Sequence, residues 1–211
     1  MNDLPVLHPV FKALIEQAQK NEALKVAVVH PCDATSLESV VSAKKAGLID
    51  PLLVGPENKI RMIAQNAKID ISSLPIEATA HSHAAAARAV EFVSEGRVEA
   101  LMKGSLHTDE LMGAIVDHQK GLRTEGRISH CFVMATRGHH EPLIVTDAAI
   151  NIAPTLSEKA DIVQNAIDLA HAIGLADIRV ALLSATETVN AAIPSTIEAA
   201  ALCKMADRGQ I

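Results

Sequence analysis

The chain has 211 residues, of which 49% are hydrophobic and 21% charged. This composition excludes a disordered chain and predicts a globular protein of one or two domains. With 19 Lys and Arg against 25 Asp and Glu, the formal net charge is −6 and no basic face is indicated, which argues against nucleic acid or an anionic membrane as a partner.

Aromatic and sulfur-bearing side chains narrow the class further. Trp and Tyr are absent and there are three Phe, so the stacking platforms of single-strand nucleic-acid binders are missing. Cys32, Cys131 and Cys203 form no C-x-x-C pair, which argues against a disulfide framework or a zinc module. The N-terminal stretch is typical of an amphipathic helix rather than a signal peptide, and no apolar run approaches the ~18 residues of a membrane span. We therefore expect a cytoplasmic protein.

Apolar spacing and capping signals predict alternating helices and strands through the first half of the chain. A T-x-x-E capping box at Thr35 and Glu38, for example, opens a helix that Gly47 ends. In chain order we expect a helix over 7–18, a strand over 24–30, a helix over 35–46, a strand over 49–54, a helix over 56–66, an extended piece over 74–78, a helix over 82–94, a strand over 98–102 and a helix over 108–118.

The second half continues with a hairpin and two more helices. Two apolar runs flank a turn-like segment at 136–141, and two further capping boxes follow prolines directly. The expected elements are a hairpin of strands 128–135 and 142–145, a helix from Thr155 and Glu158 to Gly174, a strand over Ile178–Leu183, and a helix from Ser195 and Glu198 toward Met205.

This alternation predicts the fold class. Strands that alternate with helices favour an α/β fold, here a three-layer sandwich with a mostly parallel sheet and helices on both of its faces. Ligands of such sheets bind beyond the carboxyl ends of strands, so the loops after Val29, Met102, Val145 and Leu183 are the places to look for a site.

A short loop after Met102 carries the first sign of a binding site. Lys103 supplies positive charge, Gly104 permits close backbone approach, and Ser105 and Thr108 offer hydroxyls. The helix expected to begin there presents free backbone N–H groups, which favour phosphate or another anion. In the alternative interpretation, Thr108 only caps the helix and Lys103 is a solvated cation.

Two further loops carry polar groups. Arg123 and Thr124 follow a helix-ending glycine, and the planar donor fork of Arg123 suits phosphate; the alternative is an ordinary surface cation. Thr146, Asp147 and Asn151 interrupt small apolar residues just beyond a predicted strand, which is typical of a binding loop. Equally, Asp and Asn side chains satisfy the backbone groups of turns.

Several familiar motifs are absent. Neither the Rossmann pattern G-x-G-x-x-G nor the Walker pattern G-x-x-x-x-G-K-[ST] occurs. Of the ten histidines, His81 and His83, like His139 and His140, form close pairs without a carboxylate or cysteine partner at ligand spacing, so we expect no metal site.

Five segments stand out across the sequence: KGSLHTDEL, GLRT, RISHCFVM, LIVTDAAINIAPTLSEKADIVQNAIDLAHAIG and the final CKMADRGQI. Together they resemble the phosphate acetyl/butyryltransferase family, most densely over 101–211, and lean toward its phosphate butyryltransferase branch. The resemblance implies reversible transfer of an acetyl or butyryl-type acyl group between coenzyme A (CoA) and inorganic phosphate. CoA is then a substrate, and no permanently bound cofactor is expected.

The resemblance also implies an architecture. The family has two α/β domains with a cleft between them, like the isocitrate and isopropylmalate dehydrogenases. We expect an N-terminal domain over 1–140 and an incomplete second domain over 141–211. We also expect a homo-oligomer, because an incomplete domain leaves apolar surface exposed.

Roles for particular residues follow from the same resemblance. It implies an acyl phosphate loop of Lys103, Gly104, Ser105 and Thr108, phosphate or CoA contacts from Arg123 and Thr124, and cleft positions for Thr146, Asp147 and Asn151. Acetyl-specific members carry an arginine where this sequence has Leu111-Met112-Gly113, which makes Arg123 the candidate to hold phosphate. Members continue past M-A-D-R-G-Q-I into a D-G-P-L-x-x-D-N-A segment with the thiol base, so the expected base lies beyond Ile211.

Two alternatives stay open. An NAD-dependent hydroxyacid dehydrogenase of the same superfamily needs clustered carboxylates for a divalent metal, and no D-x-x-x-D cluster follows a strand here. A noncatalytic CoA- or phosphate-binding fragment is the second alternative, because the sequence stops before the expected base. Hydride transfer would identify the first, and binding without turnover the second.

Overall fold

The computed structural model describes residues 8–136, 138 and 141–211, which form two compact units. One unit is Ile15–Thr124. The other consists of Glu125–Ile211 together with the described residues that precede Ile15. The division falls between Thr124 and Glu125, and the domain boundary expected at residue 140 stays a prediction. The units also divide between Leu14 and Ile15, within the first helix, α1 (Pro9–Ala18).

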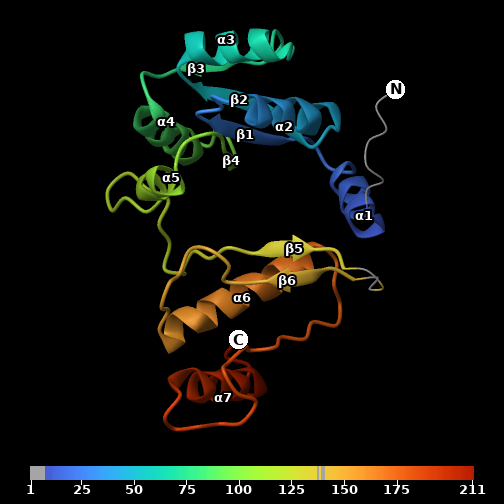
Figure 1. Cartoon of the computed structure of the whole chain (residues 1–211), viewed down its shortest axis with the longest axis vertical. Coiled ribbons are helices and arrows are strands. Elements are labelled where there is room, and N and C mark those ends of the chain that lie inside the picture. The colour runs from blue at the N-terminus through green and yellow to red at the C-terminus, as the bar shows by residue number, and fades with distance from the viewer. Residues whose placement is uncertain (1–7, 137, 139–140) are drawn as a thin grey trace. The chain divides into compact units, whose positions relative to one another are not determined.

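A four-stranded parallel sheet forms the centre of the Ile15–Thr124 unit (Figure 1). Its order is β3-β2-β1-β4, with β1 at Leu24–Val29, β2 at Ile49–Gly55, β3 at Ile76–Ala78 and β4 at Ala100–Lys103. The register places Val26 of β1 opposite both Pro51 and Ala100. The parallel α/β sheet predicted from the alternating pattern is therefore confirmed in this unit.

One proline lies inside this sheet without breaking it. The backbone N–H of Leu53 donates to Pro75 on the β3 side, so by the two-residue alternation of a strand the nitrogen of Pro51 faces that side too. Pairing with β3 begins only at Leu53. Pro51 therefore costs the sheet no hydrogen bond, because no strand of the described residues lies where its missing donor would point.

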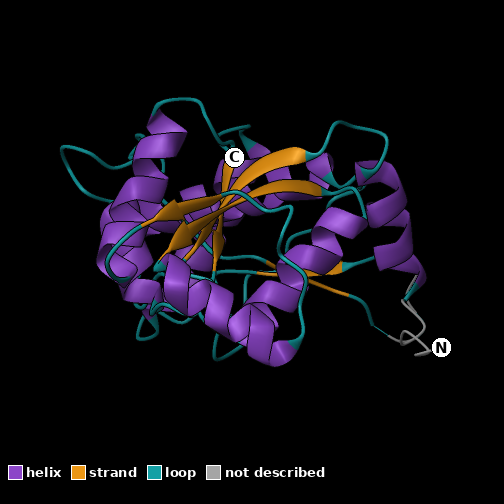
Figure 2. Cartoon of the chain, turned by 90° about the horizontal axis from the view of Figure 1, so that it is seen from above, coloured by secondary structure: helices purple, strands orange, loops and turns teal. Residues whose placement is uncertain are grey.

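Helices cover both faces of the sheet (Figure 2). Val26 and Val28 of β1 pack into a core with α2 (Ala34–Lys45) and α3 (Glu57–Ala67). Ala27 and Val29 point the other way, into a core with α4 (Ser82–Ser94) and α5 (Thr108–Ile115). Because β1 is apolar on both faces, it can only be a central strand, and the predicted three layers are confirmed here.

Two of the predicted capping boxes are wrong. Helix α2 is capped by Asp33, whose carboxylate accepts hydrogen bonds from the Ser36 backbone N–H at 2.8 Å and from its hydroxyl at 2.7 Å. Helix α7 (Pro194–Asp207) begins at the proline itself, so Ser195 lies inside its first turn. The N-cap residues are Asp33 and Ile193, so an aspartate cap in α2 and a proline at the first helical position of α7 each start the helix two residues before the T/S-x-x-E pattern indicates.

The other unit holds a hairpin and the longest described helix. Strands β5 (Phe132–Met134) and β6 (Leu143–Val145) pair antiparallel, as expected of the predicted hairpin. Helix α6 (Leu156–Ala172) has the predicted capping box, with the Thr155 N–H donating to Glu158 at 2.8 Å. No helix in the described part of the chain is long and apolar enough to cross a membrane.

The strand predicted over Ile178–Leu183 is wrong. These residues adopt no regular structure, and their backbone makes no hydrogen bond to another described backbone group. Val180 is 50% exposed and Leu183 is 91% exposed. An apolar run favours a strand only if a neighbouring strand is there to pair with it, and the described residues supply none.

Candidate functional site

The order of the four strands marks one place in the sheet as a candidate site. The chain moves from β1 to β2 to β3 in one direction and then returns to place β4 on the opposite side of β1. The loops that leave β1 and β4 consequently lead to helices on opposite faces, α2 and α5. Such a switch point leaves a crevice at the carboxyl ends of the two strands, where open α/β sheets bind their ligands.

Gly104 brings the two loops of this switch point into direct contact. Its N–H donates to the Val29 carbonyl at 2.9 Å, and the next N–H, of Ser105, donates to the His30 carbonyl at 3.0 Å. A Cβ atom on Gly104 would lie 2.6 Å from both of those carbonyl oxygens. The close backbone approach predicted for Gly104 therefore exists, but its partner is the loop after β1.

The Ser105 hydroxyl is also engaged by that loop. It donates to the His30 carbonyl at 2.9 Å, accepts from the Cys32 N–H at 3.2 Å and lies 3.2 Å from Nδ1 of the His30 ring. The hydrogen-bonding capacity of this hydroxyl is therefore already used within the protein. An anion-binding role for it stays a prediction.

His30 was not among the residues singled out from the sequence, although the loop after Val29 was. Its backbone is in the left-handed region, with φ at 53°. That conformation costs a residue other than glycine of the order of 1–3 kcal/mol and is concentrated at functional sites. A glycine would avoid this strain, so the histidine at this position is a candidate functional residue.

Charged groups surround the switch point. Burial lowers the pKa of His30, Lys59 lowers it further, and Glu110 opposes both with a smaller effect. Burial also raises the pKa of the Cys32 thiol, so this cysteine is a protonated core residue rather than a thiolate nucleophile. With a pKa below the ordinary 6.5 of histidine, the ring of His30 is mostly neutral at pH 7.

The start of α5 differs from its predicted form. His107 occupies the N-cap position and Thr108 is the first helical residue, so the interpretation of Thr108 as the cap is wrong. Glu110 accepts from the His107 N–H at 3.2 Å and also binds Ser82 and His83. Thr108 and Lys103 are both exposed, which leaves a hydroxyl and a cation available to a ligand.

Arg123 and Thr124 lie at the end of the same unit, and both are exposed. The Arg123 guanidinium contacts Nε2 of His118 at 3.3 Å. The preceding loop is fixed at Gly121, where a Cβ atom would lie 2.4 Å from the Ile115 carbonyl oxygen. Phosphate contact by Arg123 stays a prediction.

In the unit that contains Glu125–Ile211, Asp147 organises its own loop. Its carboxylate accepts from the backbone N–H groups of His130 at 3.0 Å and Asn151 at 2.7 Å, and from the Asn151 side chain. Partial burial raises its pKa, but these hydrogen bonds outweigh burial and lower the pKa to about 2. Thr146 donates to the His130 carbonyl at 3.0 Å. The described contacts are those of a turn that satisfies its own backbone groups.

Asn151 extends this network to α6. Its side chain donates to the Ile128 carbonyl at 3.0 Å and accepts from Nε of Arg127 at 2.6 Å. Arg127 in turn binds Glu158 of α6 at 2.9 Å. Each of these side chains, including Thr146 and Asp147, already has partners within the protein. A substrate-binding role for Thr146, Asp147 or Asn151 stays a prediction.

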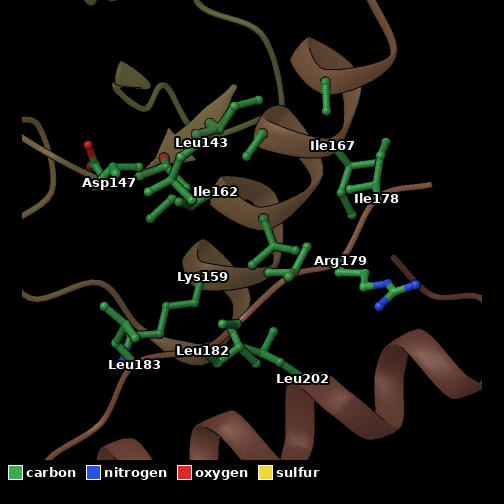
Figure 3. Close-up of a pocket in the computed structure, with 18 of the residues that line it drawn as sticks. Leu143, Asp147, Lys159, Ile162, Ile167, Ile178, Arg179, Leu182, Leu183 and Leu202 are labelled. Atoms are coloured by element: carbon green, nitrogen blue, oxygen red, sulfur yellow. The ribbon is translucent and has the colours of Figure 1, made fainter. Parts of the chain in front are cut away.

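The same unit contains an apolar cavity of about 960 Å³ (Figure 3). Leu143, Ile162, Ile178 and Leu202 line it, from β6, α6, the irregular segment and α7. The segment predicted to be a strand therefore forms one wall of this cavity. Lys159 and Glu198 also line it and form an ion pair between α6 and α7.

Histidine pairs do not assemble a cluster among the described residues. His81 accepts from the Ala84 N–H as the cap of α4, and His83 contacts Glu110 at 3.3 Å. Within the described ranges, no three His, Cys, Asp or Glu side chains gather closely enough to hold a metal ion. His139 and His140, like the turn predicted around them, lie outside the described residues.

The strand order defines an α/β protein whose candidate site is the Lys103–Thr108 loop, at the switch point of a parallel sheet. A family model described as phosphate acetyl/butaryl transferase matches residues 77–211. The chain belongs to this family.

Curated relatives carry the same activities in their names. The chain is 58% identical over 201 residues to a phosphate acetyltransferase of Rhizobium meliloti, covering 95% of this chain and 64% of that protein. It is 40% identical to a phosphate butyryltransferase of Clostridium acetobutylicum, covering 95% and 67%. The chain thus spans about three fifths to two thirds of the length of these relatives.

Solved structures agree on the fold. A branched-chain phosphotransacylase from Enterococcus faecalis superposes with a TM-score of 0.67 at 25% identity, covering 85% of this chain and 62% of that one. A phosphotransacetylase from Streptococcus pyogenes gives a TM-score of 0.75 at 18% identity, with 94% and 69% covered.

Proposed function

We propose that this chain takes part in the reversible reaction of acyl-CoA with phosphate to give acyl phosphate and CoA. Membership of the phosphate acetyl/butaryl transferase family carries the proposal. The relative with 58% identity is a phosphate acetyltransferase, which favours an acetyl group over the butyryl group toward which the sequence motifs lean. CoA and phosphate are accordingly the proposed small-molecule partners.

The loops at the switch point suit the phosphate half of this reaction. Acyl transfer to phosphate needs cations or N–H groups for the phosphate and donors for the developing oxyanion. Exposed Lys103 and Thr108, at the start of α5, are of the right type, with Gly104 setting the course of the loop. Arg123 and Thr124 are proposed as further phosphate or CoA contacts.

We propose that the complete site is a cleft between two domains, with Thr146, Asp147 and Asn151 on its second wall and the thiol base outside residues 1–211. The greater length of the relatives supports this arrangement. We also propose that the protein self-associates, because apolar side chains such as Phe132 are exposed, in this case to 52%. Light scattering at several concentrations tests this. The proposed location is the cytoplasm.

Acyl transfer and ligand binding on the same sample test the function. Acetyl-CoA formation from acetyl phosphate and CoA is followed, and calorimetry measures CoA and phosphate binding. Turnover supports the proposed reaction. Binding without turnover identifies a noncatalytic binding unit, and hydride transfer from a hydroxyacid to NAD would identify the dehydrogenase alternative. Absence of both binding and turnover refutes the proposal for this chain.

A further inference from the structure

Glu110 is a mostly buried carboxylate at the point where α5 meets α4, with its side chain 16% exposed. It accepts hydrogen bonds from the His107 backbone N–H at 3.2 Å and from the Ser82 hydroxyl at 3.1 Å. Its carboxylate also lies 3.3 Å from Nδ1 of His83. Ser82 and His83 begin α4, so one side chain joins the start of α4 to the start of α5 (Figure 1).

The loop that leads into α5 is attached at three places. Its beginning is hydrogen-bonded to the end of β1 and to the loop that follows β1. Its middle is anchored by Leu106, which is 3% exposed and belongs to the core shared by α4 and α5. Its end is held by the hydrogen bond from His107 to Glu110. Thr108 follows directly, so this last attachment sets where the loop delivers the Thr108 hydroxyl.

We propose that Glu110 is a positioning residue for phosphate binding, which fixes the end of the Lys103–Thr108 loop against α4 and so keeps Thr108 at a constant position relative to Lys103. The two exposed groups then contact the same phosphate. Glu110 itself does not touch the ligand. This inference rests on the proposed function, in which the loop binds phosphate.

The charge of Glu110 and its hydrogen bonds have opposite effects on such a ligand. Burial and Lys59 lower the pKa of His30 while Glu110 raises it, so the negative charge of Glu110 is felt at the switch point. That charge repels an anion. A fixed loop favours binding, because less conformational freedom is lost when the ligand binds. Removing the carboxylate therefore tightens phosphate binding if only its charge matters, and weakens it if Glu110 positions the loop.

Three variants separate the two effects. Glu110→Ala removes the charge and the hydrogen bonds together. Glu110→Gln removes the charge alone, because its amide oxygen can accept from the His107 N–H while its amide nitrogen donates to the Ser82 hydroxyl. Asp109→Ala is the matched control, since Asp109 is an exposed carboxylate in the same first turn of α5 and its side chain forms no hydrogen bond or ion pair within the described residues.

The first measurement is the calorimetric Kd for inorganic phosphate at pH 7. Glu110→Ala should bind phosphate about 3- to 10-fold more weakly than the wild type, the effect of one lost hydrogen bond. Glu110→Gln and Asp109→Ala should bind it as tightly as the wild type or more tightly. Equal or tighter binding by Glu110→Ala overturns the proposal. Thermal unfolding checks that each variant is folded, and if Glu110→Ala is not, weaker binding by Glu110→Gln than by Asp109→Ala overturns it instead.

The second measurement is amide hydrogen exchange of His107 in ¹⁵N-labelled protein without ligand. Exchange at His107 should be at least ~3-fold faster in Glu110→Ala and unchanged in Asp109→Ala, because only the first variant removes the acceptor. An unchanged rate in Glu110→Ala overturns the positioning role whether or not phosphate binds. If the wild type binds no phosphate, the proposed function of this chain and the ligand role of Glu110 fail together.

Discussion

Gly104→Ala tests the contact on which the switch point depends. The added Cβ would lie 2.6 Å from the carbonyl oxygens of Val29 and His30, where ordinary contacts begin at 3.4 Å. Both oxygens belong to backbone, that of Val29 at the end of β1 and that of His30, whose N–H donates to the Val54 carbonyl of β2, so neither can move away as a flexible side chain would. The strand end and the loop must separate by about 0.8 Å.

The size of the effect follows from two costs. Overpacking a tight contact costs about 1–3 kcal/mol. Separation also stretches the hydrogen bonds from the N–H groups of Gly104 and Ser105, each of which contributes about 0.5–1.5 kcal/mol. We therefore expect Gly104→Ala to lower the free energy of unfolding by about 2–4 kcal/mol, and Tm by about 5–15 °C.

A second glycine in the same unit provides the matched control. Gly113 lies within α5, and a Cβ atom there would meet nothing within 4 Å. Gly113→Ala should therefore stabilise the protein by about 0.5–1 kcal/mol through helix propensity. Urea unfolding of both variants gives opposite signs if the reasoning holds. A Gly104→Ala protein as stable as the wild type would refute the tight contact.

Three other predictions concern single side chains. In a full-length version of the protein, Arg123→Ala should reduce kcat/KM at least ~10-fold through weaker phosphate binding and leave stability unchanged, whereas Lys120→Ala should leave kcat/KM unchanged; a wild-type kcat and a wild-type KM for phosphate would make Arg123 a surface cation. The pKa of Asp147 is about 2 in the folded protein and higher in the unfolded chain. Its carboxylate therefore adds about 1–2 kcal/mol to the free energy of unfolding above pH 4, and this stabilisation is lost as pH falls toward 2. Asp147→Asn should flatten the pH dependence of urea unfolding over that range, and an identical slope would contradict this. Thr155→Ala should cost about 1 kcal/mol by removing the cap of α6, measured by thermal unfolding.

Much of the fold could be predicted because its signals are local. The apolar run of β1 and the capping box of Thr155 and Glu158 each act within a few residues, and both elements form where the sequence predicts them. Ile178–Leu183 shows the limit. Its composition favours a strand, but a strand also requires a pairing partner, and composition does not supply one.

The candidate site was predictable only in part. Lys103, Gly104 and Ser105 were found because they follow a strand and precede a helix. His30 was not found, because nothing in its own neighbourhood distinguishes it from any residue at the end of a strand. For Asp147 the sequence left two interpretations open, a binding-loop residue and a side chain that satisfies its own turn, and only its contacts show that it is the acceptor for its own loop.

Apart from Ile178–Leu183, the sequence by itself determined which described segments become helices and strands, since periodicity and caps operate over a few residues, and it identified the family through its motifs. The tertiary structure decided which loops meet. Ser105 and His30 are 75 residues apart in sequence and become neighbours only because β4 pairs with β1 on the side opposite β2. Strand order depends on how all the helices pack on the two faces of the sheet, and no local pattern encodes that global arrangement.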